Sequence, residues 1–185
     1  MLIIRPTASL FKKMKLKPLA SDSSSTTVLG DWYVNDIVLN RKNFLLCVSS
    51  VTRLHVVLKA APYQHFPERL SAALKEVLQS IGVSSDLINK ELSEMTDYKL
   101  CKTVDRSIIG SMVESKKMLK YYQEIDRLNL SEPLSVSTLL NKIISLKLSE
   151  GFPKDQALKA FNCKVERLKI VPKDNIKKTH LYIVK

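Results

Sequence analysis

The sequence is poor in glycine and in aromatic residues, and each shortage excludes or weakens a class of site. Only 4 of the 185 residues are glycine, and they are widely scattered. Phosphate-binding loops need closely spaced glycines so that the backbone can approach an anion, so a Walker or Rossmann nucleotide site is excluded. Aromatic residues make up 6% of the chain, so stacking of nucleic-acid bases on aromatic rings would be sparse.

Histidine and cysteine are scarce too, with 3 residues of each. The histidines form no HExxH or HxxxH pair and the chain has no CxxC, so we expect neither a metal site nor a cofactor. The cysteines lie far apart among apolar or strand-like neighbours, at Cys47, Cys101 and Cys163. Reduced thiols of this kind are typical of the cytosol, so we expect a cytoplasmic protein.

Long hydrophobic runs are also missing. A membrane-spanning helix needs about 18 or more consecutive apolar residues, whereas the longest runs here, such as residues 44–48, have the length of a strand. Arg5 and Pro6 interrupt the apolar start of the chain, so no signal-peptide core is present. We therefore expect no membrane association and no secretion. A mitochondrial presequence is the alternative, because residues 1–21 carry five basic residues and no acidic one.

What the chain does have is a strong excess of positive charge. It contains 30 Lys+Arg against 18 Asp+Glu, a formal net charge of +12. The basic residues concentrate in residues 1–21, in residues 99–120 and in a C-terminal group of Arg167, Lys169, Lys173, Lys177 and Lys178. Such an excess favours a polyanionic partner, for which the backbone of a nucleic acid is the leading candidate.

The length and the composition, with 45% hydrophobic and 26% charged residues, predict one globular domain over residues 1–185. Strand-like patterns occur at residues 2–5, 33–39, 44–49, 53–59, 165–171 and 179–184. Helical spacing of apolar residues occurs at residues 7–15, 67–81, from 84 or 85 onward, 105–126, 136–144 and 153–161. We therefore predict an α+β domain with an antiparallel sheet of about five strands, a central meander, and helices packed mainly on one face.

The predicted strand at residues 53–59 carries two candidate functional residues. Leu54, Val56 and Leu58 alternate with more polar residues, which places Arg53 and His55 on the wetter face of the strand. There both side chains are candidates for a phosphate contact, and His55 for a general acid or base. The alternative is a histidine on a half-exposed sheet face without a catalytic task.

The predicted helix at residues 105–126 carries a second group. Asp105 is a good helix cap, and Arg106, Lys117 and Lys120 lie along one flank of the helix. Arg106 and the neighbouring hydroxyls are candidates for binding an anion. The alternative is helix capping combined with a tight contact between the helix and the sheet.

Two further features allow both a structural and a functional interpretation. Gly110 inside the helix costs about 1 kcal/mol relative to alanine, which indicates close backbone packing at that position. Lys12 and Lys13, in the predicted helix at residues 7–15, are either a polyanion contact or part of a solvated helix face.

Three motifs resemble those of a family of small bacterial proteins carrying an uncharacterised domain. They are residues 2–7 (Leu-Ile-Ile-Arg-Pro-Thr), residues 30–33 (Gly-Asp-Trp-Tyr), and Arg106-Ser107 followed by Gly110-Ser111-Met112. The similarity covers roughly residues 2–125, and residues 131–185 form a C-terminal extension. In the family Asn commonly stands where this chain has Asp105, so here a negative charge lies beside the expected anion contact.

The resemblance implies a bacterial or mobile-element protein of the cytoplasm and assigns it no activity. It nominates one site, made of Arg5, Thr7, Asp31, Trp32, Arg106 and Ser107.

Three functions are compatible with these observations. The first is a non-enzymatic module that binds a nucleic-acid backbone through Arg5, Thr7, Lys12, Lys13, Arg53, His55, Arg106, Ser107, Lys117 and Lys120. The second is an interaction protein that binds an acidic protein partner, such as an antitoxin-like or phage-encoded inhibitor. The third and least favoured is an enzyme acting on a phosphorylated or nucleotide substrate, with Arg5, His55 and Arg106 around one pocket.

Overall fold

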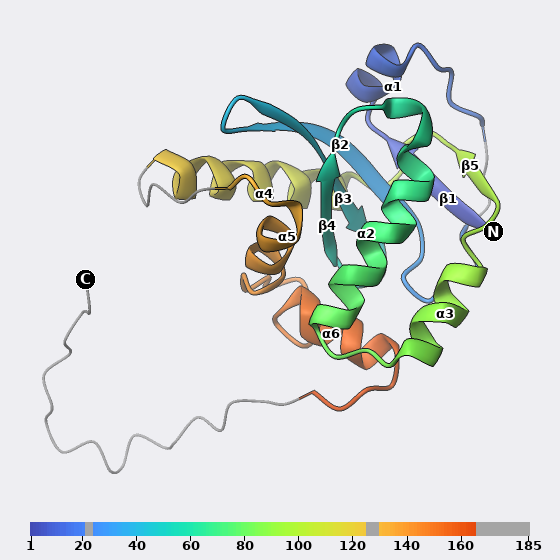
Figure 1. Ribbon diagram of the computed structural model, residues 1–185, viewed down its shortest axis with the longest axis vertical. Helices are drawn as coiled ribbons and strands as arrows, with labels where there is room; N and C mark the ends of the chain where they lie inside the picture. Colours follow the sequence, from blue (N-terminus) through green and yellow to red (C-terminus); the bar gives the residue numbers. More distant parts are fainter. Residues whose placement is uncertain (21–23, 125–129, 166–185) are drawn as a thin grey trace, which may run out of the picture.

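A mixed sheet of five strands runs through the middle of the protein (Figure 1). The computed structural model describes residues 1–20, 24–124 and 130–165. The strands follow the order β4-β3-β2-β1-β5 across the sheet. Their bounds are Leu2–Pro6 (β1), Trp32–Leu39 (β2), Lys42–Ser49 (β3), His55–Lys59 (β4) and Tyr98–Leu100 (β5).

The sheet contains both antiparallel and parallel pairs. β2, β3 and β4 form the predicted antiparallel meander, whereas β1 runs parallel to both of its neighbours, β2 and β5. The α+β class and the number of strands are confirmed, but the sheet is mixed rather than antiparallel throughout. The reason lies in the connection after β1, because the chain returns through helix α1 (Ala8–Met14) before β2 begins, and such a crossover joins strands of the same direction.

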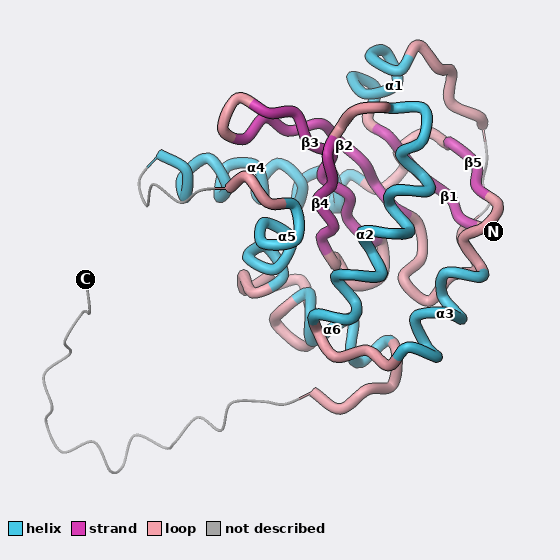
Figure 2. The backbone as a smooth tube through the Cα atoms, in the orientation of Figure 1, coloured by secondary structure: helices cyan, strands magenta, loops and turns pink. Residues whose placement is uncertain are grey.

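Helices cover both faces of the sheet (Figure 2). One core joins alternate strand residues such as Val34 and Cys47 to helices α1, α2 (Phe66–Ser80), α3 (Ser85–Ser93) and α6 (Pro153–Ala160). The other core joins the intervening residues, such as Leu46 and Val57, to helices α4 (Arg106–Glu124) and α5 (Pro133–Asn141). The expectation of helices mainly on one face is corrected here. The cause is visible in β3, whose residues from Phe44 to Ser49 are all buried and therefore need cover on both sides.

The helices begin and end where the local sequence favours it. Pro67 lies in the first turn of α2, Leu70, Leu74 and Val77 bury one stripe, and Gly82 follows with a φ of +90°. A short 3-10 turn, Tyr63–His65, precedes α2. The other predicted helices are confirmed to within a few residues. The strands predicted at residues 165–171 and 179–184 lie in residues 166–185, outside the described part of the chain, apart from Val165.

Within the described ranges, no helix is both long enough and apolar enough to cross a membrane.

The outer edge of β4 is covered by two side chains of α5. Ser137 Oγ accepts a hydrogen bond from the amide of Val57 at 2.8 Å. Asn141 accepts from the amide of His55 at 2.8 Å and donates to the carbonyl of His55 at 2.9 Å. Four residues of helix rise by about 6 Å and two residues of strand by about 6.8 Å, so one helix face can serve two successive outward-facing strand positions. The two side chains thus replace the missing neighbouring strand.

We predict that Asn141→Ala lowers the free energy of unfolding by about 2 to 4 kcal/mol, because it leaves both backbone groups of His55 buried without their partner. Urea unfolding of the two proteins measures this difference. The matched control is Ser135→Ala, an exposed position of the same helix. Equal stability of the two variants would contradict the assigned role of Asn141.

Candidate functional site

A pocket of about 370 Å³ lies between the start of β4, α4, and the end of α5 with the segment that follows it. Its polar and charged residues are Arg53, His55, Ser111, Glu114, Ser115, Ser145 and Lys147. Its apolar wall is formed by Met118, Leu140, Ile143, Ile144 and Leu146. The structure thus joins strand and helix residues that the sequence analysis considered separately, and it adds Ser115 and the apolar wall, which that analysis did not identify.

Arg53 is held in place by its backbone and by the first turn of α4. It ends the β3–β4 turn with a φ of +57°, a conformation that a residue with a side chain rarely adopts. Its Nη2 donates to Ser107 Oγ at 2.8 Å and lies 3.8 Å from Asp105 Oδ2. Its Nη1 is buried and has no hydrogen-bond partner among the described residues. Burial lowers the pKa of the Arg53 guanidinium, and the Asp105 carboxylate opposes this shift.

His55 lies in the same pocket and is only 6% exposed. Its Nε2 lies 2.8 Å from Ser115 Oγ, and the Ser115 hydroxyl in turn donates to the carbonyl of Ser111 at 2.9 Å. Because that hydroxyl proton is already used, Nε2 carries the hydrogen of the neutral ring and donates it to Ser115. Nδ1 is then a hydrogen-bond acceptor, buried and without a partner in the described part of the chain.

Burial lowers the pKa of His55 from 6.5 to about 4. The nearby Asn141 side chain, which bonds the backbone of His55, opposes this shift, and the positive charge of Arg53 adds to it. The ring is therefore neutral at pH 7. The expectation of a wetter strand face is wrong, because α4 and α5 cover the side of β4 on which His55 and Val57 lie.

Gly110 borders this pocket and does not mark a close contact. A Cβ built at Gly110 meets no atom within 4 Å. The expectation of tight packing there is wrong, because Gly110 lies about half a turn away from Ile108 and Met112, the residues through which α4 faces the sheet. Met112 is fully buried in that core and therefore packs rather than binds.

At the start of α4, Asp105 caps the helix, as the structural alternative in the sequence analysis predicted. Asp105 Oδ1 accepts the amide hydrogen of Ser107 at 2.7 Å, and the Asp105 amide donates to the Tyr33 hydroxyl at 3.0 Å. Arg106 is exposed and does not line the pocket.

Arg5 and Asp31, two residues of the family-like motifs, form a buried ion pair. Arg5 is 3% exposed, its Nε donates to Asp31 Oδ2 at 2.6 Å, and its Nη1 donates to the carbonyl of Lys102 at 2.6 Å. Asp31 Oδ1 also accepts the amide hydrogen of Ser25 at 2.8 Å. The pair therefore ties β1 to the segments before β2 and after β5, which is a structural task.

The other nominated residues do not join this pair in one site. Thr7 donates to Asn35 Oδ1 at 3.0 Å. Trp32 is fully buried in the core on the side opposite α4 and α5. His55 lines the 370 Å³ pocket, but Arg5 and Arg106 do not. The arrangement of all three around one pocket, on which the enzyme hypothesis depends, is absent from this pocket.

Lys13 of α1, which was predicted, and Lys116 of α4, which was not, approach each other at β2. The Lys13 ammonium pairs with the Asp36 carboxylate, and the charge of Lys116 on α4 also acts on Asp36. Burial raises the pKa of Asp36, but the hydrogen bond and charge of Lys13 outweigh it and the net pKa is lowered. Burial lowers the pKa of Lys116; Asp36 opposes that shift and Lys13 adds to it.

A second pocket, of about 450 Å³, is lined here by residues of β2 from Asp36 to Leu39 and by Lys116 and Lys120. The sequence analysis missed Lys116. Its position in the sequence could have identified it. Lys116 lies four residues after Met112 and three before Leu119, and residues at these spacings lie on the same side of a helix.

The remaining predicted lysines are exposed. Lys12 lies on the solvent side of α1. Lys117 lies 3.0 Å from Glu114 and Lys120 lies 3.7 Å from Glu124, both along the exposed side of α4. The C-terminal basic group, Arg167 to Lys178, lies outside the described residues. Over the described ranges, no group of three or more His, Cys, Asp or Glu residues is arranged to hold a metal ion.

A family model described as a domain of unknown function (DUF6933) matches residues 3–156. The chain belongs to this family. The match runs beyond residue 125, where the similarity of the motifs was expected to end, and it covers α5 and every residue that lines the 370 Å³ pocket. No curated protein and no solved structure matches the chain.

We predict that Gly110→Ala raises the free energy of unfolding by about 1 kcal/mol, because alanine favours a helix and the new methyl group meets open space. Gly82→Ala is the matched control. A Cβ at Gly82 also meets nothing within 4 Å, but the φ of +90° disfavours any side chain. The free energy of unfolding of this variant should therefore fall by about 1 kcal/mol or more. Urea unfolding measures both changes. A lower free energy of unfolding for Gly110→Ala would contradict the placement of Gly110 beside open space.

We predict that burial of His55 makes the protein less stable in acid. At pH 7 the ring is neutral in both states, whereas below pH 6.5 the unfolded chain binds a proton that the folded protein accepts only near pH 4. The free energy of unfolding should therefore fall by about 3 kcal/mol over this window.

Urea unfolding between pH 7 and pH 4 measures this contribution as the difference between the wild-type protein and His55→Gln. His65→Gln, which replaces an exposed histidine, is the matched control. Identical pH profiles of the wild-type protein and His55→Gln would show that His55 titrates normally in the fold.

Proposed function

We propose that the protein binds the phosphate backbone of nucleic acids through one basic surface. This basic surface consists of Lys12, Lys13, Lys17, Arg41, Lys42, Lys116 and Lys120. The observation that carries the proposal is the approach of Lys13 and Lys116, from helices far apart in the sequence, to the single carboxylate of Asp36.

The charges around Asp36 favour an additional anion. Lys13 and Lys116 repel each other, since the charge of Lys13 lowers the pKa of Lys116, and one carboxylate cannot neutralise both. Lys120 lines the adjoining 450 Å³ pocket and adds a further positive charge, which Glu124, 3.7 Å away and lining the same pocket, partly offsets. A phosphate group placed there would relieve the repulsion. Contacts of Lys and Arg with phosphates, which release counterions from the nucleic acid, are the usual basis of backbone binding.

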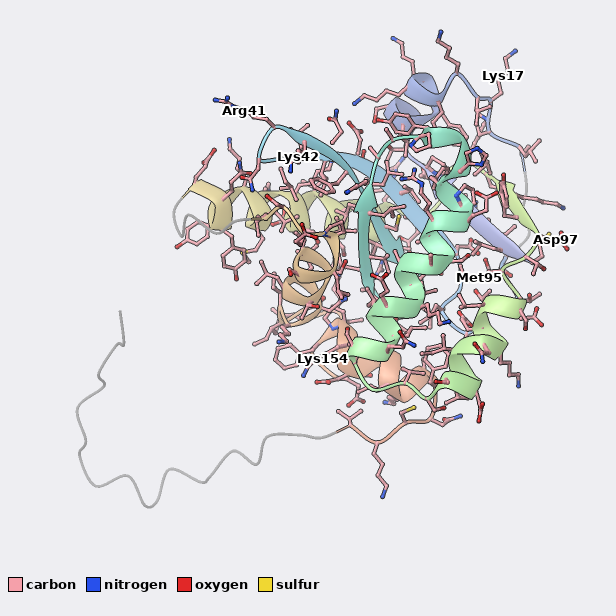
Figure 3. The ribbon with its side chains drawn as sticks, in the orientation of Figure 1. Lys17, Arg41, Lys42, Met95, Asp97 and Lys154 are labelled. Carbon is pink, nitrogen blue, oxygen red and sulfur yellow. The ribbon has the colours of Figure 1, made fainter. Side chains whose placement is uncertain are left out.

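The β2–β3 hairpin extends this surface. Asn40 and Arg41 have φ values of +48° and +62°, as in the tight turns that connect neighbouring antiparallel strands. Arg41 and Lys42 are exposed and lie, with Lys17, along the upper side of the protein in Figure 3. Long side chains on a projecting hairpin and on two helices suit contacts with a groove or a flexible strand, and no base-reading motif is required.

We predict a steep dependence of binding on salt. If about six phosphates are engaged, the logarithm of the association constant should fall with the logarithm of salt concentration at a slope near −5. Fluorescence anisotropy with a labelled 20-nucleotide RNA and a 20-base-pair DNA of generic sequence, between about 50 and 200 mM NaCl, measures the slope.

The triple variant Lys13→Gln/Lys116→Gln/Lys120→Gln should reduce the slope by about 3 units. Its control, Lys75→Gln/Lys90→Gln/Lys99→Gln, removes the same net charge from exposed positions on α2, α3 and β5 and should change the slope far less. A flat salt response, or equal effects of the two triple variants, would refute the proposal and direct attention to an acidic protein partner.

A further inference from the structure

The 370 Å³ pocket holds two buried polar atoms without partners. Among the described residues, Arg53 Nη1 and His55 Nδ1 are two of only three buried side-chain polar atoms that make no hydrogen bond. Each such atom costs about 1 to 3 kcal/mol in a folded protein, and most are therefore satisfied. Both belong to residues that line the same pocket, but each atom is closed to solvent, so a bound molecule satisfies it only once its side chain turns toward the pocket.

We infer that this pocket binds a small organic carboxylate with a branched apolar body and a hydroxyl group near the carboxylate. The pocket volume lies within the roughly 300 to 1,000 Å³ that small-molecule sites occupy. This site is separate from the basic surface and does not depend on the proposed function.

Arg53 supplies the contact for the carboxylate. Ser107 fixes its Nη2 and Asp105 lies 3.8 Å away, so the guanidinium is held in position while Nη1 keeps its donors free of other protein groups described here. A guanidinium group matches the planar geometry of a carboxylate better than an ammonium group does. Asp105 competes for the same charge, so we expect moderate rather than tight affinity.

His55 supplies the contact for the hydroxyl. With Nε2 donating to Ser115, Nδ1 can only accept a hydrogen bond, and the ligand must bring the donor. A buried acceptor of this kind discriminates against a ligand that lacks the hydroxyl, because that ligand leaves the acceptor unpaired.

The apolar wall accounts for the branched body. Leu140 and Ile143 line the inner part of the pocket, whereas Ile144 is 64% exposed and Leu146 is 97% exposed. A branched hydrocarbon group seated against them would remove this apolar surface from water, which favours binding by about 25 cal/mol for each Å² buried.

Isothermal titration calorimetry on the full chain tests the inference with three probes of one carbon skeleton. We expect 2-hydroxy-4-methylpentanoate to bind with a dissociation constant below about 1 mM. The analogue 4-methylpentanoate, which lacks the hydroxyl, and the amide 2-hydroxy-4-methylpentanamide, which lacks the charge, should each bind at least tenfold more weakly. Absence of saturable binding, or equal binding of all three probes, would overturn the inference.

Variants locate the binding. Arg53→Gln should weaken the binding of 2-hydroxy-4-methylpentanoate at least tenfold. Because Arg53 is partly buried and has an unusual backbone conformation, a second variant, Ile144→Gln, alters the exposed wall without disturbing the core and should weaken binding severalfold. Val104→Gln, at a residue that is 68% exposed and outside the pocket, should leave the affinity unchanged.

Two more outcomes are decisive. Unchanged affinity in both Arg53→Gln and Ile144→Gln would overturn the inference, as would equally strong competition by inorganic phosphate, which has no apolar body. The triple variant of Lys13, Lys116 and Lys120 should bind 2-hydroxy-4-methylpentanoate as the wild-type protein does, so failure of the nucleic-acid proposal and failure of this inference can be distinguished.

Discussion

The hydrogen bonds between α5 and the outer edge of β4 connect the fold to the pocket. Ser137 and Asn141 satisfy the outward-facing backbone groups of Val57 and His55, which would otherwise lie unpaired beneath a helix. They set the distance of α5 from the sheet and hold the backbone of His55, so the imidazole meets Ser115 on α4. The pocket lies between α5, which is anchored to β4, and α4, which packs on β2 and β3 and is linked to His55 of β4 through Ser115.

Polar side chains play the same part elsewhere at the margins of the sheet. Glu91, 2% exposed, accepts the amide hydrogens of Val28 and Leu29 at 2.8 and 3.0 Å, and burial raises the pKa of its carboxyl group even though these bonds oppose the shift. Arg69 donates to four successive carbonyls, from Lys59 to Pro62, where the chain leaves β4.

Arg5 and Asp31 belong to this structural group, although their place in recognisable motifs made them functional candidates. Against this background of satisfied polar groups, Arg53 Nη1 and His55 Nδ1 stand apart, since they are buried together at a pocket and have no partner in the described part of the chain.

Helix α4 serves three environments at once. Ile108, Met112 and Leu119 pack on the sheet. Lys116 and Lys120 line the pocket beside β2, and Ser111, Ser115 and Met118 line the pocket beside β4. A helix of 19 residues is long enough to present all three faces along its length. Only the face that packs on the sheet must be apolar, which leaves the other two faces free to carry polar and charged residues.

The sequence by itself determined the class of fold and most of the elements, because these depend on local patterns. The meander at residues 33–59 follows from alternation, and α2 follows from Pro67, an apolar stripe and Gly82. It also identified Asp105 as a helix cap and Arg53, His55, Ser107 and Ser111 as candidates, since their residue types and positions are local facts.

Tertiary structure alone decided which candidates meet. Contacts between segments far apart in the chain determine the parallel placement of β1, the cover on both faces of the sheet and the burial of His55. The periodicity of a sequence reports only on local structure and does not predict such contacts. The ion pair of Arg5 with Asp31 and the open space beside Gly110 could not be predicted for the same reason. A motif shows which side chain is present, whereas the groups around it are set only when distant segments pack together.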